Sequence, residues 1–330
     1  MGSAASFTDS HAMLLYGAPR EHLMARVRYL RAGITHGAAV LIAATREHLN
    51  ELGGEIALGG SGAAVCDLTS AGANPGRVLS VIRAFARENS ARPIQCVLDV
   101  GWLERPREYL AEAIGYEWLL RRALARSRAE VLCSYDNRLD SDLLAAAERE
   151  HAVIFRGTEP RASATFAGDR PADQRGLAAQ ALSWPPGNAS SLTFRYEQSE
   201  VRRFAADKAL GARLPADRVR DLVIAVGELA GNVLVHTQGL GTLTIWTTET
   251  EVIFQVSDSG QIADPLAGTL RPEPAQIESH RGLWLVHQVG DLVQVRTGPA
   301  GTTVRVHMRL QPRAPEAITS DHGSSEVACR

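Results

Sequence analysis

Short apolar segments alternate with helical patterns through the first half of the chain, and this alternation constrains the fold more than any other feature. Strands are predicted at residues 39–43, 64–68, 94–100, 130–134 and 152–155, and helices at 21–35, from 46 onward, and at 77–87, 107–125 and 140–149. Each predicted strand is continuously apolar, which is typical of strands that are covered on both faces. We therefore predict an α/β unit in which helices cover both sides of a parallel sheet.

The pattern changes after this unit, which we place at residues 8–157. Residues 158–191 are rich in Arg, Ala, Pro and Gly and show little apolar periodicity, so they are predicted to form a linker. Helices and strands return at 192–310, and residues 311–330 are predicted to be a disordered tail. A chain of 330 residues is long enough for two domains with cores of their own.

The composition excludes several functional classes. A formal net charge of −2 is not typical of a broad basic surface, so direct binding to nucleic acid is not expected. Lys208 is the only lysine, and it lies in neither a phosphate-binding P-loop nor the strand that carries the lysine of ordinary protein kinases. No apolar run reaches membrane-spanning length and the N-terminus has no signal-peptide character, so we expect a cytoplasmic protein without a membrane partner.

Cysteine and histidine form no metal motif along the sequence. The cysteines are scattered, without a CxxC pair, at Cys66, Cys96, Cys133 and Cys329. The first three lie in apolar surroundings and are predicted to be reduced core residues, with a disulfide or metal role as the less favoured alternative. The spacing of His11, His22, His36 and His48 also matches no metal motif, so ordinary surface or core placement is expected.

The most informative helix is predicted at residues 217–237, after Pro215, which suits a first helical turn. Its apolar residues recur at steps of three and four, which predicts one buried stripe. Glu228, Asn232 and His236 follow at intervals of four and therefore lie along one side. An amide oxygen can help to hold Mg²⁺ and a carboxylate can deprotonate an attacking group. The alternative is that these side chains line a solvated face.

Three further motifs follow this helix in order. Asp258-Ser259-Gly260 ends a predicted strand, Arg281-Gly282-Leu283 is predicted to open a helix, and Gly301-Thr302-Thr303 precedes the last predicted strand. With these motifs, the segment from about 195 to 310 resembles the GHKL (Bergerat) ATP-binding domain of anti-sigma-factor serine/threonine kinases. The resemblance implies a C-terminal α/β sandwich, in which a mixed sheet is backed by helices, and it implies ATP and Mg²⁺ as cofactors.

The resemblance also implies roles for individual residues. Asn232 becomes the Mg²⁺ ligand and Glu228 the candidate general base. Asp258 becomes the acceptor of the adenine amino group, because a carboxylate at a strand end is a fixed acceptor for an exocyclic amine. Gly260 allows the backbone to pass close to the base.

Further along the chain, the resemblance implies that the nucleotide's phosphates are bound near Arg281, Gly282 and Leu283. A helix that begins near Gly282 offers free N–H groups to phosphate there. The loop at 262–279 is predicted to act as a lid, and Thr303 is expected near the nucleotide. The chain departs from the family at His280, where a glycine is usual, and this substitution bears on catalysis more than on adenine binding.

The first unit resembles the MEDS sensory domain, a module related to RecA-like ATPases, through its opening HAMLLY, the helix and strand that follow, and the later CSYD. Residues 44–48 read ATREH where a RecA-like ATPase carries its P-loop, so no ATP hydrolysis is expected in this unit. Open α/β sheets bind ligands at the carboxyl ends of their strands. Candidate residues for a small-molecule signal there are Asp99, Trp102, Glu117, Tyr135 and Asp136, for each of which packing, solvation or turn formation is the alternative role.

Together these features predict a signalling regulator that binds ATP–Mg²⁺ and acts as an anti-sigma factor or as a serine kinase on an anti-sigma antagonist. The expected partners are a sigma factor, an anti-sigma antagonist or both, and a homodimer is left open. A non-catalytic ATP-binding interaction module is the alternative. A histidine kinase is the third reading, and it is disfavoured because no histidine lies between His151 and His236 to accept a phosphoryl group.

Overall fold

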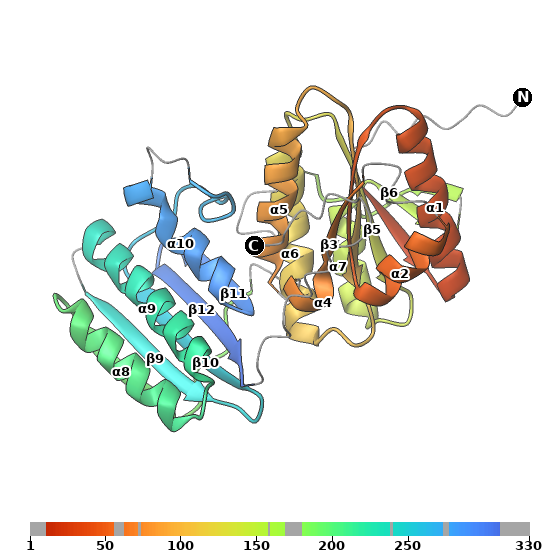
Figure 1. The fold of residues 1–330 in the computed structure, drawn as a ribbon. Helices are drawn as coiled ribbons and strands as arrows, with labels where there is room; N and C mark the ends of the chain where they lie inside the picture. The colour runs from red at the N-terminus through yellow and green to blue at the C-terminus, as the bar shows by residue number, and fades with distance from the viewer. Residues whose placement is uncertain are drawn as a thin grey trace, which may run out of the picture. The chain divides into compact units, whose positions relative to one another are not determined.

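The computed structural model describes residues 11–55, 63–71, 74–157, 159–168, 180–237, 240–272 and 277–310. Within it the chain forms two compact units, one built mainly from residues up to 179 and the other mainly from residues 180 onward (Figure 1). The tail predicted at 311–330 lies outside the described residues, as does part of the predicted linker, residues 169–179.

The first unit contains a seven-stranded sheet. Its strands are β1 (His11–Tyr16), β2 (Ala39–Ala44), β3 (Ala64–Asp67), β4 (Ile94–Gly101), β5 (Ala129–Asp136), β6 (Val153–Arg156) and β7 (Glu159–Ala162). They follow the order β3-β2-β4-β5-β1-β6-β7, and every pair is parallel except β6 with β7. Strands β1, β2 and β4 are buried along their whole length. The predicted parallel sheet with apolar strands is therefore confirmed.

Helices cover both faces of this sheet, as Figure 1 shows for α1 and α2 on one side and α5 and α6 on the other. The helices of the unit are α1 (Pro19–Thr35), α2 (Arg46–Glu55), α4 (Leu68–Ala71), α5 (Pro75–Glu88), α6 (Arg107–Leu124) and α7 (Ser141–Glu150). On the α1 side, Val27 and Leu30 pack with strand residues such as Ile42 in one core cluster. None of the described helices is long and apolar enough to cross a membrane.

Two strands of this sheet were not predicted from the sequence. Strand β1 lies between β5 and β6 and pairs with both in parallel. Its sequence, HAMLLY, is apolar but also suits a helix, and only pairing on both sides makes it a strand. Strand β7, with the sequence EPRA, is exposed at all four positions and pairs only with β6, so it has no apolar pattern to detect.

Two of the three cysteines predicted to be reduced are free and buried, namely Cys96 and Cys133. The prediction is wrong at Cys66, which is disulfide-bonded. Cys66 lies on β3, the edge strand of the sheet, where a neighbouring strand covers one side only. A position at a sheet edge leaves room for another segment to approach, and the apolar sequence around Cys66 does not reveal this.

The second unit is a five-stranded sheet with helices on one face (Figure 1). Its elements are β8 (Ser190–Phe194), α8 (Gln198–Gly211), α9 (Ala216–His236), β9 (Gly241–Thr247), β10 (Glu251–Asp258), α10 (Ile277–Val289), β11 (Leu292–Gly298) and β12 (Gly301–Arg309). The order is β11-β12-β10-β9-β8, and all pairs are antiparallel. The helix-backed sandwich is confirmed, but the sheet is not mixed. Short turns join β9 to β10 and β11 to β12, and such hairpins are antiparallel by construction.

Helix α9 runs through the middle of this unit, within one residue of its predicted ends. Its predicted apolar stripe is buried, with Leu222, Val226 and Val233 in the core cluster. Two glycines of α9 face side chains of α8. A Cβ on Gly227 would lie 2.5 Å from Nε of Arg202, and one on Gly231 would lie 2.7 Å from Nε2 of Gln198, so a larger residue at either position would displace the α8 side chain. The buried stripe and the contact with α8 leave the Glu228–Asn232 side of α9 for other contacts.

Replacing Gly301 is expected to destabilise the second unit. Gly301 opens β12 with φ of +119°, and a Cβ there would overlap the carbonyl oxygen of Asp258. Gly301→Ala should therefore lower the free energy of unfolding by about 1–3 kcal/mol. The control is Gly298→Ala, because Gly298 pairs with Gly301 in register but has no atom within 4 Å of the added Cβ. Urea denaturation of both variants measures the difference, and equal stabilities would contradict the prediction.

Candidate functional site

The second unit contains a cavity of about 330 Å³. It is lined by residues of α9, the ends of β10 and β12, the loop that follows β10, and α10. Five of the residues selected from the sequence lie on its wall, namely Asn232, Asp258, Gly260, Gly282 and Leu283. These residues come from three separate motifs, and the fold brings them to one cavity. The volume is in the range of small-molecule sites.

The polar pair on α9 meets α10 at Gly282. A Cβ on Gly282 would lie 3.1 Å from Oε2 of Glu228 and 3.2 Å from Oδ1 of Asn232. The absence of a side chain at this position therefore lets α10 lie directly against the two polar groups. Asn232 lines the cavity, whereas Glu228 does not and lies beside Gly282, one helical turn before Asn232. The two side chains are neighbours, as their spacing predicts.

Asp258 ends β10 and projects a partly buried carboxylate into the cavity. Burial raises the pKa of Asp258 above its ordinary value, although the N–H of Gly260 donates to Oδ1 at 2.6 Å and acts in the opposite direction. A Cβ on Gly260 would lie 2.8 Å from both Asp258 Oδ1 and Thr237 Cγ2, so a larger residue here would displace the carboxylate of Asp258 or the side chain of Thr237. The carboxylate is thus held in place as an acceptor for a donor inside the cavity.

The threonine in the cavity wall is Thr302, whereas Thr303 does not line the cavity, and its expected place near the nucleotide stays a prediction. Thr302 lines the cavity and donates its hydroxyl to the carbonyl of Gly260 at 2.8 Å. Thr303 is not on the wall, and its Oγ1 lies 3.0 Å from Oγ of Ser257. Neighbouring strand residues face opposite sides of a sheet, so only one of the two can face the cavity. Val304 and Val306 are buried and are spaced by two residues from Thr302. This spacing would have indicated that Thr302, and not Thr303, lies on their side of the sheet.

Helix α10 begins earlier than predicted. It starts at Ile277, so Gly282 is its sixth residue and the free N–H groups of the first turn belong to residues 277–280. The expectation that the helix begins near Gly282 is therefore wrong. No proline or glycine interrupts residues 277–281, so nothing stops the helix from extending there. Arg281 is exposed and does not line the cavity. The side chain of His280 and residues 273–276 of the predicted lid lie outside the described residues.

In the first unit the five candidate ligand residues do not gather at one site. Asp99 is buried on the α1 side, where it meets the guanidinium of Arg26 at 3.4 Å and Nδ1 of His48 at 2.7 Å. Burial acts to raise the pKa of Asp99, but Arg26 and the hydrogen bond to His48 outweigh it and hold that pKa at about 2. Asp99 also accepts the N–H of Thr45 at 3.2 Å. A buried carboxylate therefore occupies the turn where a P-loop would hold phosphate.

Asp136 is close to the group at Asp99, since the charges of both carboxylates act on Tyr16 and His22. Asp136 accepts hydrogen bonds from Arg138, and Trp102 packs under the guanidinium of Arg105 at 4.7 Å. Glu117 and Tyr135 share a hydrogen bond of 2.8 Å inside a second buried group of polar side chains. This group includes His11, and the group at Asp99 includes His22 and His48, so three histidines expected to be ordinary core or surface residues belong to polar clusters. Their partners are too distant along the chain for any spacing motif to show.

These features define an α/β protein whose second unit has the architecture of a nucleotide-binding sandwich, with an amide and a carboxylate in one cavity. Residues 193–308 match the family described as histidine kinase-like ATPase domain. Residues 10–152 match the family described as MEDS, the methanogen/methylotroph DcmR sensory domain. No curated protein matches the chain. The two matches indicate an ATP-binding signalling regulator with an N-terminal sensory domain.

Proposed function

We propose that the protein binds ATP–Mg²⁺ in its second unit and acts as an anti-sigma factor or as a serine kinase on an anti-sigma antagonist, under control of the first unit. The observation that carries this proposal is that Asn232 and Asp258 line the same cavity. They come from a helix and a strand end, and each supplies an oxygen of the kind that the proposed ligand needs. The match of residues 193–308 to ATPase domains supports the same ligand.

The residues on the wall fit a nucleotide with its magnesium ion. The amide oxygen of Asn232 is a hard, neutral ligand of the kind that Mg²⁺ accepts beside phosphate and water oxygens. Asp258 is the acceptor for the exocyclic amine of adenine, and Leu283 with Val256 offers apolar surface to the base. The magnesium ion, when bound, offsets charge on the phosphates. The chain's own contribution is to position the nucleotide between α9 and the end of β10.

In the kinase version, Glu228 takes the proton from the hydroxyl of a substrate serine. The serine oxygen then forms a bond to the γ-phosphorus of ATP, the bond to the bridging oxygen breaks, and ADP leaves. Glu228 lies one helical turn from Asn232 and next to Gly282, and this position beside the expected metal end of the cavity supports its role as the base. The partner protein supplies the serine, and its binding would bring the hydroxyl to the carboxylate.

A non-catalytic ATP-binding module is a second candidate, and one observation favours it. Helix α10 continues through Gly282 without a break, so the amide of Gly282 does not stand free to bind phosphate. The departure at His280 lies in the same helix. In this version ATP binding would change the affinity of the second unit for a sigma factor, and no phosphoryl group would be transferred.

One assay with the full chain separates these functions. The purified protein is incubated with γ-labelled ATP, Mg²⁺ and candidate partner proteins encoded nearby, and nucleotide binding is measured in parallel. An acid-stable serine phosphate on the partner supports the kinase, and binding without transfer supports the interaction module. An acid-labile histidine phosphate would replace both proposals by a histidine kinase. Absence of any ATP binding would overturn the proposal as a whole.

The adenine contact is tested by replacing Asp258. Asp258→Ala is expected to lower ATP affinity about 10- to 100-fold and to remove the preference for ATP over GTP, because a charge-assisted hydrogen bond to the amine is lost. Asp264→Ala is the matched control, since Asp264 also lines the cavity but is exposed and caps its own loop through the N–H of Leu266. Competition binding with both nucleotides measures the effect. If an Asp258→Ala variant still discriminated ATP from GTP, a residue other than Asp258 would have to recognise the adenine base.

A further inference from the structure

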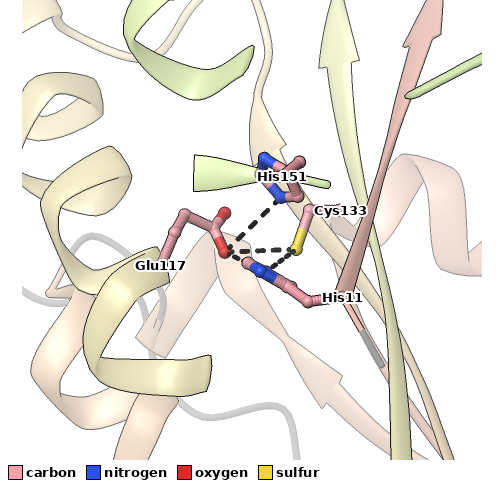
Figure 2. Close-up of side chains that lie close together, drawn as sticks. All are labelled: His11, Glu117, Cys133 and His151. Carbon is pink, nitrogen blue, oxygen red and sulfur yellow. Dashed lines mark hydrogen bonds and ion pairs between the residues drawn. The ribbon is translucent and has the colours of Figure 1, made fainter. Parts of the chain in front are cut away.

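Four metal-ligating side chains meet inside the first unit, in a place that the nucleotide proposal does not use. They are His11 at the start of β1, Glu117 on α6, Cys133 on β5 and His151 at the end of α7 (Figure 2). All four are at most 4 % exposed. Such a concentration of polar atoms in an apolar core is costly unless every atom is satisfied.

The ligand atoms of these four residues converge on one small volume. Nε2 of His11 lies 2.7 Å from Oε2 of Glu117, and Sγ of Cys133 lies 3.4 Å and 3.3 Å from these two atoms. Nε2 of His151 lies 3.9 Å from the same carboxylate oxygen. Figure 2 shows the four side chains pointing toward one another from different elements. All four ligand atoms lie within 4.8 Å of one another.

The surrounding hydrogen bonds orient the ligand atoms inward. Nδ1 of His151 lies 2.8 Å from the carbonyl of Ala147, so it carries the proton and Nε2 points its lone pair at the cluster. Nε2 of His151 has no hydrogen-bond partner among the described residues. The hydroxyl of Tyr135 donates to Oε1 of Glu117 at 2.8 Å, which leaves Oε2 for the cluster. Metal-binding histidines and carboxylates are held by outer contacts of this kind.

The charges of the cluster also suit a divalent cation. Nε2 of His151 offers its lone pair to the cluster, and the thiol of Cys133 donates its proton to Oε2 of Glu117 at 3.3 Å. One divalent ion with a carboxylate, a thiolate and two neutral imidazoles has no net charge. A neutral assembly is the form that a buried site tolerates best.

We propose that His11, Glu117, Cys133 and His151 form a closed, four-coordinate site for a zinc-class divalent metal ion. Zinc accepts nitrogen, sulfur and oxygen ligands in a tetrahedron whose edges are roughly 3.3–3.8 Å. The separations of 3.3 and 3.4 Å match those edges, the separation of 3.9 Å is slightly longer, and the pair of His11 and Glu117 at 2.7 Å has to open. The other two separations, from His151 to His11 and to Cys133, are within 4.8 Å. Binding forms a metal–sulfur bond and releases the thiol proton of Cys133 to solvent. The proton that Nε2 of His11 donates to Glu117 moves to Nδ1, so that Nε2 is free to form its bond to the metal.

A metal ion at this site would connect two strands of the sheet to the two helices that carry the other ligands. Its ligands come from β1, β5, α6 and the end of α7, whose positions in the sequence run from 11 to 151. Four protein ligands leave no open position, which is typical of structural sites. The ion would therefore stabilise the sensory unit by binding the folded state and not the unfolded chain.

Cobalt binding to the full chain tests this site. The purified protein is dialysed against a chelator and titrated with Co²⁺, whose visible bands report tetrahedral geometry and whose near-ultraviolet charge-transfer band reports a thiolate ligand. We expect one equivalent of Co²⁺ to give both signals, and one equivalent of Zn²⁺ to bleach them and to raise the unfolding temperature. The Cys133→Ser variant should lose the charge-transfer band.

Cys96→Ser is the matched control, because Cys96 is a buried, free thiol on the neighbouring strand β4 and lies outside the cluster. It should retain both signals. His151→Gln, whose amide preserves much of the side-chain size, should weaken Co²⁺ binding at least about tenfold, and circular dichroism shows that each variant is folded. A wild-type protein without the charge-transfer band, or a folded Cys133→Ser variant that keeps it, would overturn the proposal.

Discussion

Asn232→Ala is expected to lower the affinity for ATP–Mg²⁺ by about 100-fold or more, which corresponds to roughly 2.7 kcal/mol. The variant removes the amide oxygen that lines the cavity on α9, and with it the proposed protein ligand of the magnesium ion. A magnesium ion held by Asn232 would offset charge on the phosphates, so its loss would weaken nucleotide binding at that end of the cavity. Titration with ATP in excess Mg²⁺, followed by calorimetry or a fluorescent analogue, measures the effect.

Two controls sharpen this result. Asn188→Ala changes an exposed asparagine of the same unit that does not line the cavity, and it should bind ATP like the wild type. Chelation of Mg²⁺ should reduce the affinity of the wild type to that of Asn232→Ala and should leave the variant almost unchanged. Equal ATP affinity for the wild type and Asn232→Ala would refute the assignment of the site.

Glu228→Ala is expected to bind ATP within about threefold of the wild type and to lose phosphoryl transfer by about 10²–10⁴-fold. The reason lies in the geometry, because Glu228 stands beside Gly282 and Asn232 but does not line the cavity wall. Removing its carboxylate therefore takes away the proposed proton acceptor and leaves the residues of the cavity wall in place. Rates of serine phosphorylation under saturating ATP measure the loss of transfer. The binding assay measures the ATP affinity of the variant.

The matched control is Glu200→Ala, which removes an exposed glutamate from α8 in the same unit and should leave both binding and transfer intact. A Glu228→Ala variant with wild-type transfer would remove this residue from the chemistry. A Glu228→Ala variant that fails to bind ATP would mean that binding and transfer are not separated as proposed. If neither protein transfers phosphate while both bind ATP, the interaction module becomes the better description.

Local patterns in the sequence were sufficient for most of the secondary structure. Helix α9 was predicted within one residue because its apolar stripe has a clear helical period and Pro215 marks its start. The strands β2, β4 and β5 were predicted because they are short, apolar and bounded by helical patterns. Strand β1 was not, since an apolar run of six residues fits either state and its two parallel neighbours decide between them.

The candidate nucleotide site was predictable in its motifs and less so in its details. Asn232, Asp258 and Gly260 were selected from motif order, and the fold places them around one cavity. The sequence did not distinguish Thr302 from Thr303, because two adjacent threonines differ only in the face of the strand they occupy. The start of α10 was missed because Gly282 was taken as a boundary, whereas it serves as the close contact with α9.

The sequence by itself determined the two units, the type of nearly every element and the polar stripe on α9, since these depend on neighbours within a few turns of the chain. Only the tertiary structure decided which distant side chains meet. His11 and Glu117 are separated by 106 residues and touch because β1 enters the sheet between β5 and β6 while α6 covers that face. Such contacts depend on strand order and register, which the residue types near either partner do not encode.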